Sequence, residues 1–189
     1  ITQMRLGFNE ANDRFCQGHT VMQDLELCEK YGFDCIDIQS ECLNRDLEKG
    51  IVTIEELGAW FATHHLKMLS YNALCFFNMK QTAEEKQAVM DELDEIIRRC
   101  NILGCKMIVV VPSQDMKARG LQPTRKEIRE DAVAVLKEMV KKVEPHGIKL
   151  SLEFCGAPDM SINRFEDAYA IVEAVDSPLV GVTLDQYHF

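Results

Sequence analysis

Short apolar runs and longer amphipathic segments alternate along the whole chain. Six of the short runs have the length and apolar character of buried strands. The segments between them carry apolar residues at helical spacing, while Glu, Lys and Arg fill the remaining positions, as in residues 84–99. The pattern therefore predicts strands and helices in alternation, with strands at residues 4–8, 35–38, 67–71, 107–111, 148–154 and 180–184.

This alternation predicts a parallel sheet, because each helix returns the chain to the same end of the sheet. Two parallel architectures compete, a doubly wound open sheet and an eight-stranded barrel. The first predicted strand runs into residues 9–13 (NEAND) without the glycine-rich phosphate loop of nucleotide-binding open sheets. We therefore expect an α/β fold of the (β/α)8 TIM barrel type.

The length of the chain limits how much of a barrel it can supply. Each strand and helix together take about 35 residues, so eight such units would take about 280. Six units fit into the 189 residues, and the last predicted strand lies directly before the final residues. We expect residues 1–189 to form a single barrel domain of about six βα units that is truncated at its C-terminus.

Polar residues lie at the carboxyl ends of the predicted strands, where barrel enzymes carry their active sites. The candidate residues are Asn9 after the first strand, Asn72 after the third, Glu153 in the fifth, and Asp185 and His188 after the sixth. Other polar residues that we expect in the same ring are Glu10, Gln39, Glu41, Ser113 and Gln114.

Glu153 and Asp185 are the most informative pair. They end neighbouring strands, which lie about 4.8 Å apart in a sheet, so both carboxylates can reach one divalent cation at about 2.0–2.2 Å. Glu153 also interrupts an apolar run, where an unpaired charge is costly. The spacing alone leaves two alternatives open: a structural ion pair, and Asp185 as the cap of a following helix.

Composition narrows the function classes. The chain is 47% hydrophobic and 28% charged, as globular proteins are. No run approaches the roughly 20 apolar residues of a membrane helix, and residues 1–9 lack a signal-peptide pattern, so we expect a cytoplasmic protein without membrane association. The net charge is −10 with dispersed basic residues, which disfavours nucleic-acid binding.

The cysteines fit a reducing compartment. No two of them form a C-x-x-C pair, and most fall inside apolar patterns, so we expect free and mostly buried thiols. There are eight, at Cys16, Cys28, Cys35, Cys42, Cys75, Cys100, Cys105 and Cys155.

Several short motifs, in their order along the chain, resemble the xylose isomerase-like TIM barrels. They are FNEA at residues 8–11, LELCEK at 25–30, NAL at 72–74, LEF at 152–154 and the stretch 180–189 that contains LD and YHF. This family includes sugar epimerases and isomerases, and within it the chain is most similar to isomerases of inositol catabolism. The resemblance extends over the whole chain.

The resemblance implies a site and a reaction. In such proteins the residues matching Glu153 and Asp185 are two of four ligands of one divalent ion (Mn, Mg, Co or Zn), and the other two lie on later strands with no counterpart here. It further implies a sugar or keto-polyol substrate and an enediol intermediate. Glu153 would transfer a proton between adjacent carbons, His188 would assist catalysis by binding a substrate oxygen, and Asn9 and Asn72 would bind other hydroxyl groups.

Two other functions are compatible with the same fold. One is a metal-dependent endonuclease, which the dispersed basic residues and the absence of additional histidines after the second and third strands disfavour. The other is a non-catalytic fragment or subunit whose sheet edges another chain covers. A homo-oligomer is compatible with the isomerase as well.

Overall fold

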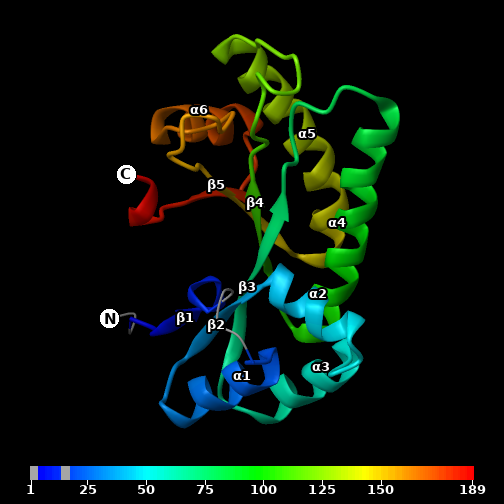
Figure 1. The fold of residues 1–189 in the computed structure, drawn as a ribbon, viewed down its shortest axis with the longest axis vertical. Helices are drawn as coiled ribbons and strands as arrows, with labels where there is room; N and C mark the ends of the chain where they lie inside the picture. The colour runs from blue at the N-terminus through cyan, green and yellow to red at the C-terminus, as the bar shows by residue number, and fades with distance from the viewer. Residues whose placement is uncertain (1–3, 14–17) are drawn as a thin grey trace. The chain divides into compact units, whose positions relative to one another are not determined.

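The computed structural model describes residues 4–13 and 18–189. The chain packs as two compact units, of which unit 1 comprises Ile1–Asn72 and Arg98–Met107, and unit 2 comprises Ala73–Ile97 and Ile108–Phe189. Strands and helices alternate as predicted, and the six-stranded sheet has its strands in chain order, β1 to β6 (Figure 1). This confirms a parallel α/β chain of about six βα units.

Unit 1 contains the first three strands, which are parallel. Gly7 of β1 lies opposite Cys35 of β2, and Cys35 lies opposite Lys67 of β3. Helices α1 and α2 pack against β2. The elements of this unit are β1 (Gly7–Asn9), the 3-10 helix η1 (Glu10–Asn12), α1 (Val21–Lys30), β2 (Cys35–Gln39), α2 (Ser40–Glu48), α3 (Ile54–Thr63) and most of β3 (Lys67–Cys75).

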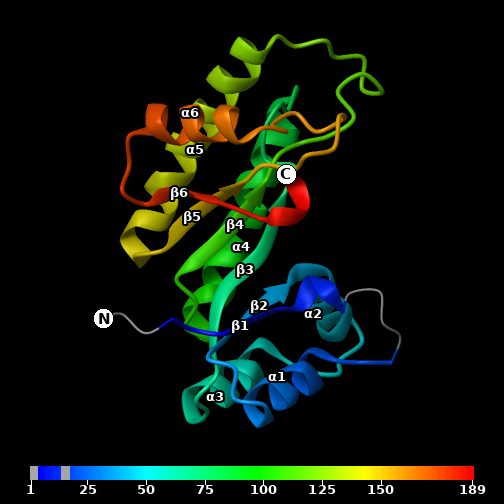
Figure 2. The same cartoon turned by 90° about the vertical axis from the view of Figure 1, so that its left-hand side faces the viewer.

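Unit 2 contains the later strands, with β5 and β6 paired in parallel so that Glu153 lies opposite Thr183. Figure 2 shows β4, β5 and β6 side by side, and α6 packs against α5. The elements are most of α4 (Ala83–Leu103) and of β4 (Met107–Val111), α5 (Arg125–Val143), η2 (Glu144–His146), β5 (Lys149–Glu153), α6 (Phe165–Val175), β6 (Val180–Thr183) and η3 (Gln186–His188).

Each unit has its own apolar core. Burying an aliphatic or aromatic side chain of this size contributes about 1.5–3 kcal/mol, so these residues account for most of the favourable free energy. In unit 1 the fully buried residues include Leu25, Ile36, Ile38, Leu43, Leu57 and Leu66, and in unit 2 they include Phe77, Leu93, Ile108, Leu136, Met139 and Leu152.

Two predicted strand boundaries were wrong by more than one residue. The first strand begins at Gly7, because Met4 and Leu6 are 92% and 56% exposed and have no core to pack against. The third strand continues to Cys75, because Ala73 and Leu74, whose side chains point to opposite faces of the sheet, are both buried. Asn72 therefore lies inside β3 and not after it.

Glycines follow two of the helices. Gly104 follows α4 with φ +72°, and Gly147 follows η2 with φ +61°. A residue with a side chain adopts this left-handed backbone only at a cost, so glycine turns the chain toward the next strand.

Gly58 of α3 is required for a different reason. A Cβ atom at this position would lie 2.7 Å from the Ile102 carbonyl oxygen and 2.9 Å from Ile102 Cγ2. Replacing glycine by alanine in a helix ordinarily stabilises by up to about 1 kcal/mol. Here we expect Gly58→Ala to destabilise the protein by about 1–3 kcal/mol, because the inserted methyl group overpacks the contact. Urea unfolding measures the change.

Gly181→Ala is the matched control, since a Cβ atom there meets nothing within 4 Å. A Gly58→Ala variant as stable as wild type would show that the contact with Ile102 is not tight.

The cysteines among the described residues are free. Cys75 is exposed and Cys155 half-buried, while the other five are buried, as most were predicted to be; Cys16 lies outside the described residues. In residues 4–13 and 18–189, no helix combines the length and apolar character needed to cross a bilayer.

Candidate metal centre

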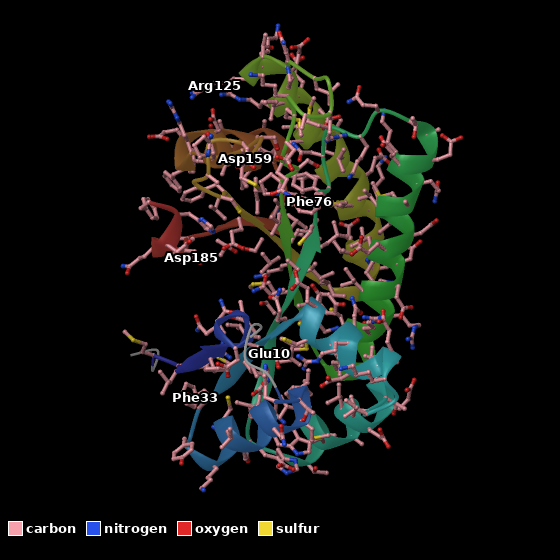
Figure 3. The ribbon with its side chains drawn as sticks, in the orientation of Figure 1. Glu10, Phe33, Phe76, Arg125, Asp159 and Asp185 are labelled. Carbon is pink, nitrogen blue, oxygen red and sulfur yellow. The ribbon has the colours of Figure 1, made fainter. Side chains whose placement is uncertain are left out.

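Glu153, Asp185 and His188 converge in unit 2. Glu153 is the last residue of β5, Asp185 follows β6, and His188 ends η3. Each offers one potential ligand atom, and these atoms all lie within 4.8 Å of one another. Figure 3 shows Asp185 on the segment that follows β6. The convergence of the two predicted carboxylates is therefore present, with His188 beside them.

The strand register brings the two carboxylates together. Ser151 and Thr183 lie on neighbouring strands, and their hydroxyl oxygens are 2.6 Å apart, so these positions face the same side of the sheet. Side chains alternate along a strand, which places Glu153 on the same face as Ser151, and Thr183 is two residues before Asp185. Small hydroxyl side chains thus lie beside the acidic ones.

Asp185 also caps the short helix that follows it. Its Oδ1 accepts a hydrogen bond from the Tyr187 backbone N–H at 2.9 Å, so the capping alternative is correct as well. A carboxylate has two oxygens, and capping uses one of them. The cap and a ligand role are therefore compatible.

His188 lies close to Glu153, with its Nε2 3.7 Å from Glu153 Oε1, and the two side chains are only 19% and 13% exposed. This separation exceeds that of a direct hydrogen bond. It is close to the roughly 3.4 Å between neighbouring ligand atoms around a tetrahedral ion with ligand distances near 2.1 Å. Two carboxylates and an imidazole at these separations fit a divalent cation such as zinc, manganese or cobalt.

Asn9 and Asn72 lie together in unit 1. The Asn72 side-chain amide donates to Asn9 Oδ1 at 3.5 Å, and the same oxygen accepts from the Ala11 backbone N–H at 3.0 Å. Asn9 therefore also caps η1, and both side chains are partly buried. Their predicted contact with substrate stays a prediction.

Glu10 was expected in the ring of polar residues at the carboxyl ends of the strands, but it is fully buried in unit 1. Its Oε1 accepts a hydrogen bond from the Gln39 N–H at 2.9 Å, and its carboxyl group interacts with that of Asp24. Burial, a hydrogen bond with Asp24 and the negative charges of Asp24 and Asp46 together raise the pKa of Glu10 to about 9. Glu10 thus holds its proton at neutral pH and supports the fold of this unit.

Asn78 was not singled out in the sequence, yet it connects three loops of unit 2. It is fully buried, its Oδ1 accepts from the Ser113 backbone N–H at 2.7 Å, and its amide donates to Ser161 Oγ at 3.2 Å. Ser113 and Ser161 belong to the loops after β4 and β5. A lone asparagine in a loop carries no sequence signal for such a role.

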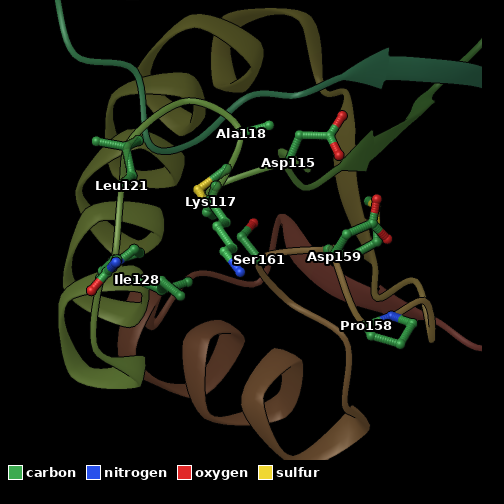
Figure 4. Close-up of a pocket in the computed structure, with 12 residues that line it drawn as sticks. Asp115, Lys117, Ala118, Leu121, Ile128, Pro158, Asp159 and Ser161 are labelled. Atoms are coloured by element: carbon green, nitrogen blue, oxygen red, sulfur yellow. The ribbon is translucent and has the colours of Figure 1, made fainter.

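A cavity of about 720 Å³ lies between the same two loops (Figure 4). Its wall combines apolar side chains with the charged Asp115, Lys117 and Asp159. None of Glu153, Asp185 and His188 lines it, so it is separate from the carboxylate cluster.

Comparison with known proteins gives the family. The sequence model of the family described as xylose isomerase-like TIM barrel matches residues 25–189. The chain belongs to this family. In this xylose isomerase-like TIM barrel chain, Glu153 and Asp185 lie at the carboxyl ends of β5 and β6, and barrel enzymes have their active sites at this end of the strands.

Similarity to individual members of the xylose isomerase-like family is also clear. The chain is 36% identical over 186 residues to the inosose isomerase of Bacillus velezensis, a match that covers 98% of this chain and 64% of that protein. A crystal structure of IolI protein with a binding zinc atom superposes with a TM-score of 0.89 at 37% identity, covering 98% of this chain and 64% of that one. The chain thus spans 64% of the length of these relatives.

A family 2 AP endonuclease from Brucella melitensis has a TM-score of 0.75 at 18% identity, with 98% of this chain and 70% of that one covered. At that identity the likeness shows the shared fold alone.

Proposed function

We propose that the chain carries the metal-holding carboxylates of a divalent-metal-dependent isomerase or epimerase. Its reaction moves a carbonyl group between adjacent carbons of a keto-polyol or sugar of the inosose type. The observation that carries the proposal is the convergence of Glu153, Asp185 and His188 within 4.8 Å. The 36% identity to an inosose isomerase supports the substrate class.

Glu153 and Asp185 would hold the ion in this proposal. Their carboxylates, with the nearby imidazole, suit Mn, Mg, Co or Zn to differing degrees, and the zinc in the IolI crystal structure favours zinc among them. When bound, a divalent ion supplies positive charge that stabilises negative charge developing on substrate oxygens.

Glu153 is the proposed proton carrier. It stands at the end of β5 with its side chain 13% exposed, so it is largely shielded from bulk water. A carboxylate in this position can take a proton from one carbon and return it to the neighbouring carbon of an enediol intermediate.

His188 is proposed to bind and orient the substrate. Its Nε2 lies 3.7 Å from Glu153 Oε1, and an imidazole ring can hydrogen-bond a substrate oxygen. Asn9 and Asn72 are proposed to bind further hydroxyl groups, since their amides offer both donors and acceptors.

The proposed partner is therefore a small polar molecule. The net charge of −10 favours such a substrate over the phosphate backbone of the endonuclease alternative. A cytoplasmic location, a single domain over residues 1–189 and a homo-oligomer accompany this proposal as predictions from the sequence.

The test combines metal binding with turnover in the full-length protein. We expect one divalent ion per chain and conversion of inosose with uptake of solvent deuterium. In Asp185→Asn, the amide oxygen keeps the cap of η3 but loses the charge, so we expect metal affinity to fall by about 10–100-fold. Calorimetric zinc titration and mass spectrometry measure the two effects.

Asp176→Asn is the control, because Asp176 is exposed and precedes β6, at the strand end opposite Asp185. If the wild-type protein takes up no divalent ion, the result would support the alternative that the chain is a non-catalytic fragment or subunit. Tight, salt-sensitive binding to abasic duplex DNA would instead support the endonuclease.

A further inference from the structure

The loop after β5 touches the backbone of His188 at Gly156. A Cβ atom at position 156 would lie 2.5 Å from the His188 carbonyl oxygen, 3.2 Å from its carbonyl carbon and 3.3 Å from its Cα. All three are backbone atoms, so no side-chain rotation relieves the contact. A residue with any side chain at this position would have to displace η3 or the loop.

Gly156 is not needed for its backbone conformation. Its φ lies outside the left-handed region, in contrast to Gly147, which has φ +61° and open space around its Cβ position. The requirement at position 156 is therefore steric, since alanine could adopt the same backbone without strain. Glycine here allows one segment of backbone to approach another closely.

Two further contacts fix the same short helix. The Asp185 cap holds its first turn through Tyr187 N–H at 2.9 Å. At its other end the ring of Phe189 packs edge-on against that of Phe154, with centroids 5.3 Å apart at an interplanar angle of 88°. Phe154 is only 2% exposed, so it is a fixed support, and η3 is held at both ends with Gly156 beneath His188.

We propose that Gly156 is a positioning residue that sets His188 at its working distance from Glu153. The close approach at Gly156 lets the His188 backbone sit against the β5–α6 loop, which holds the imidazole Nε2 3.7 Å from Glu153 Oε1. This inference rests on the proposed function for its catalytic meaning, but the geometric claim concerns only residues of this chain.

A displaced His188 should impair substrate orientation more than metal binding. The crowded atoms belong to His188 itself, whereas Asp185 is anchored by β6 and Glu153 by β5. Misplacing a catalytic contact by about 1 Å can cost about 100-fold in rate. We therefore expect Gly156→Ala to lower kcat/KM by about 10–100-fold, which exceeds its effect on zinc affinity because the two carboxylates stay in place.

The experiment follows the ring nitrogens of His188 by NMR in the full-length protein. There are five histidines in the chain, and His188→Gln assigns the signals of interest. In zinc-free protein at fixed pH, Glu153→Gln should shift the His188 ring signals because the two side chains are neighbours. In the Gly156→Ala variant we expect the shift caused by Glu153→Gln to be less than about half of its wild-type size, because the two side chains would lie farther apart and interact less.

Gly181→Ala is the matched control, since its added methyl group meets nothing within 4 Å, and it should leave the His188 response unchanged. If Gly156→Ala does not fold, Phe189→Leu can replace it, because this variant weakens the ring contact with Phe154 that holds η3. It should also reduce the shift of the His188 signals caused by Glu153→Gln. A full response in the folded variant overturns the positioning role. Because this readout needs no metal or substrate, a wild-type protein without zinc binding or turnover would count against the proposed function alone.

Discussion

Replacing Glu153 by glutamine is expected to abolish exchange of the substrate C–H hydrogen with solvent. Glutamine has nearly the same shape and can still bind an ion through its amide oxygen, but it cannot accept a proton at neutral pH. Loss of a positioned general base costs about 10²–10⁴-fold, so exchange should fall below detection. Mass spectrometry of inosose incubated in D₂O with the full-length protein measures it.

Glu173→Gln on the exposed surface of α6 is the control for this substitution, and it should exchange at the wild-type rate. Undiminished exchange in Glu153→Gln would remove Glu153 from the proton-transfer role and leave it as a ligand only. A parallel zinc titration separates a proton-transfer role from a ligand role. If Glu153 is a ligand only, Glu153→Gln should bind zinc more weakly, and exchange should return to the wild-type rate at saturating zinc.

Replacing Glu10 by glutamine is expected to stabilise the protein at alkaline pH. Burial raises the pKa of Glu10 to about 9 in the folded state, from an ordinary value of 4.5. Between these values the folded protein holds a proton that the unfolded chain releases, so the free energy of unfolding decreases as pH rises, by up to about 1.4 kcal/mol per pH unit. Glutamine keeps the bond from Gln39 N–H and donates to Asp24 without titrating.

We therefore expect the two proteins to be similar near pH 5 and Glu10→Gln to be more stable by at least about 2 kcal/mol near pH 8. Urea unfolding at a series of pH values measures the difference. Glu26→Gln on the exposed face of α1 is the control and should follow the wild-type pH profile. Parallel profiles for wild type and Glu10→Gln would mean that the Glu10 carboxyl is already ionised in the folded state at neutral pH.

The parts of the fold that follow periodic patterns were predictable. Apolar runs located all six strands, and the parallel arrangement followed from alternation, because a crossover helix constrains strand direction. The pairing of Glu153 with Asp185 was also accessible, since it depends only on strand order and on which residue ends each strand. Boundaries were less certain, as Asn72 shows, because one polar residue does not end a strand whose next residues are buried.

Contacts that depend on tertiary packing were not predictable. Glu10 directly follows Asn9, the last residue of the first strand, but only the structure shows that α1 brings Asp24 against it and that the site is buried. Gly156 is a single glycine in a loop, and its need for space arises from the backbone of His188, 32 residues later in the sequence. Such requirements belong to pairs of distant segments and leave no periodic pattern.

The buried Asn78 has a consequence for attempts to alter specificity. Its side chain and its backbone carbonyl each form a hydrogen bond with Ser113. The Ser113 carbonyl accepts a hydrogen bond from the Ser161 N–H at 2.8 Å, and the Ser161 hydroxyl accepts one from the Asn78 amide. Exchanging any one of these βα loops for that of another barrel would leave polar atoms of the other two without partners, which costs about 1–3 kcal/mol for each. Engineers who graft new loops onto this scaffold should therefore transplant the three as one block.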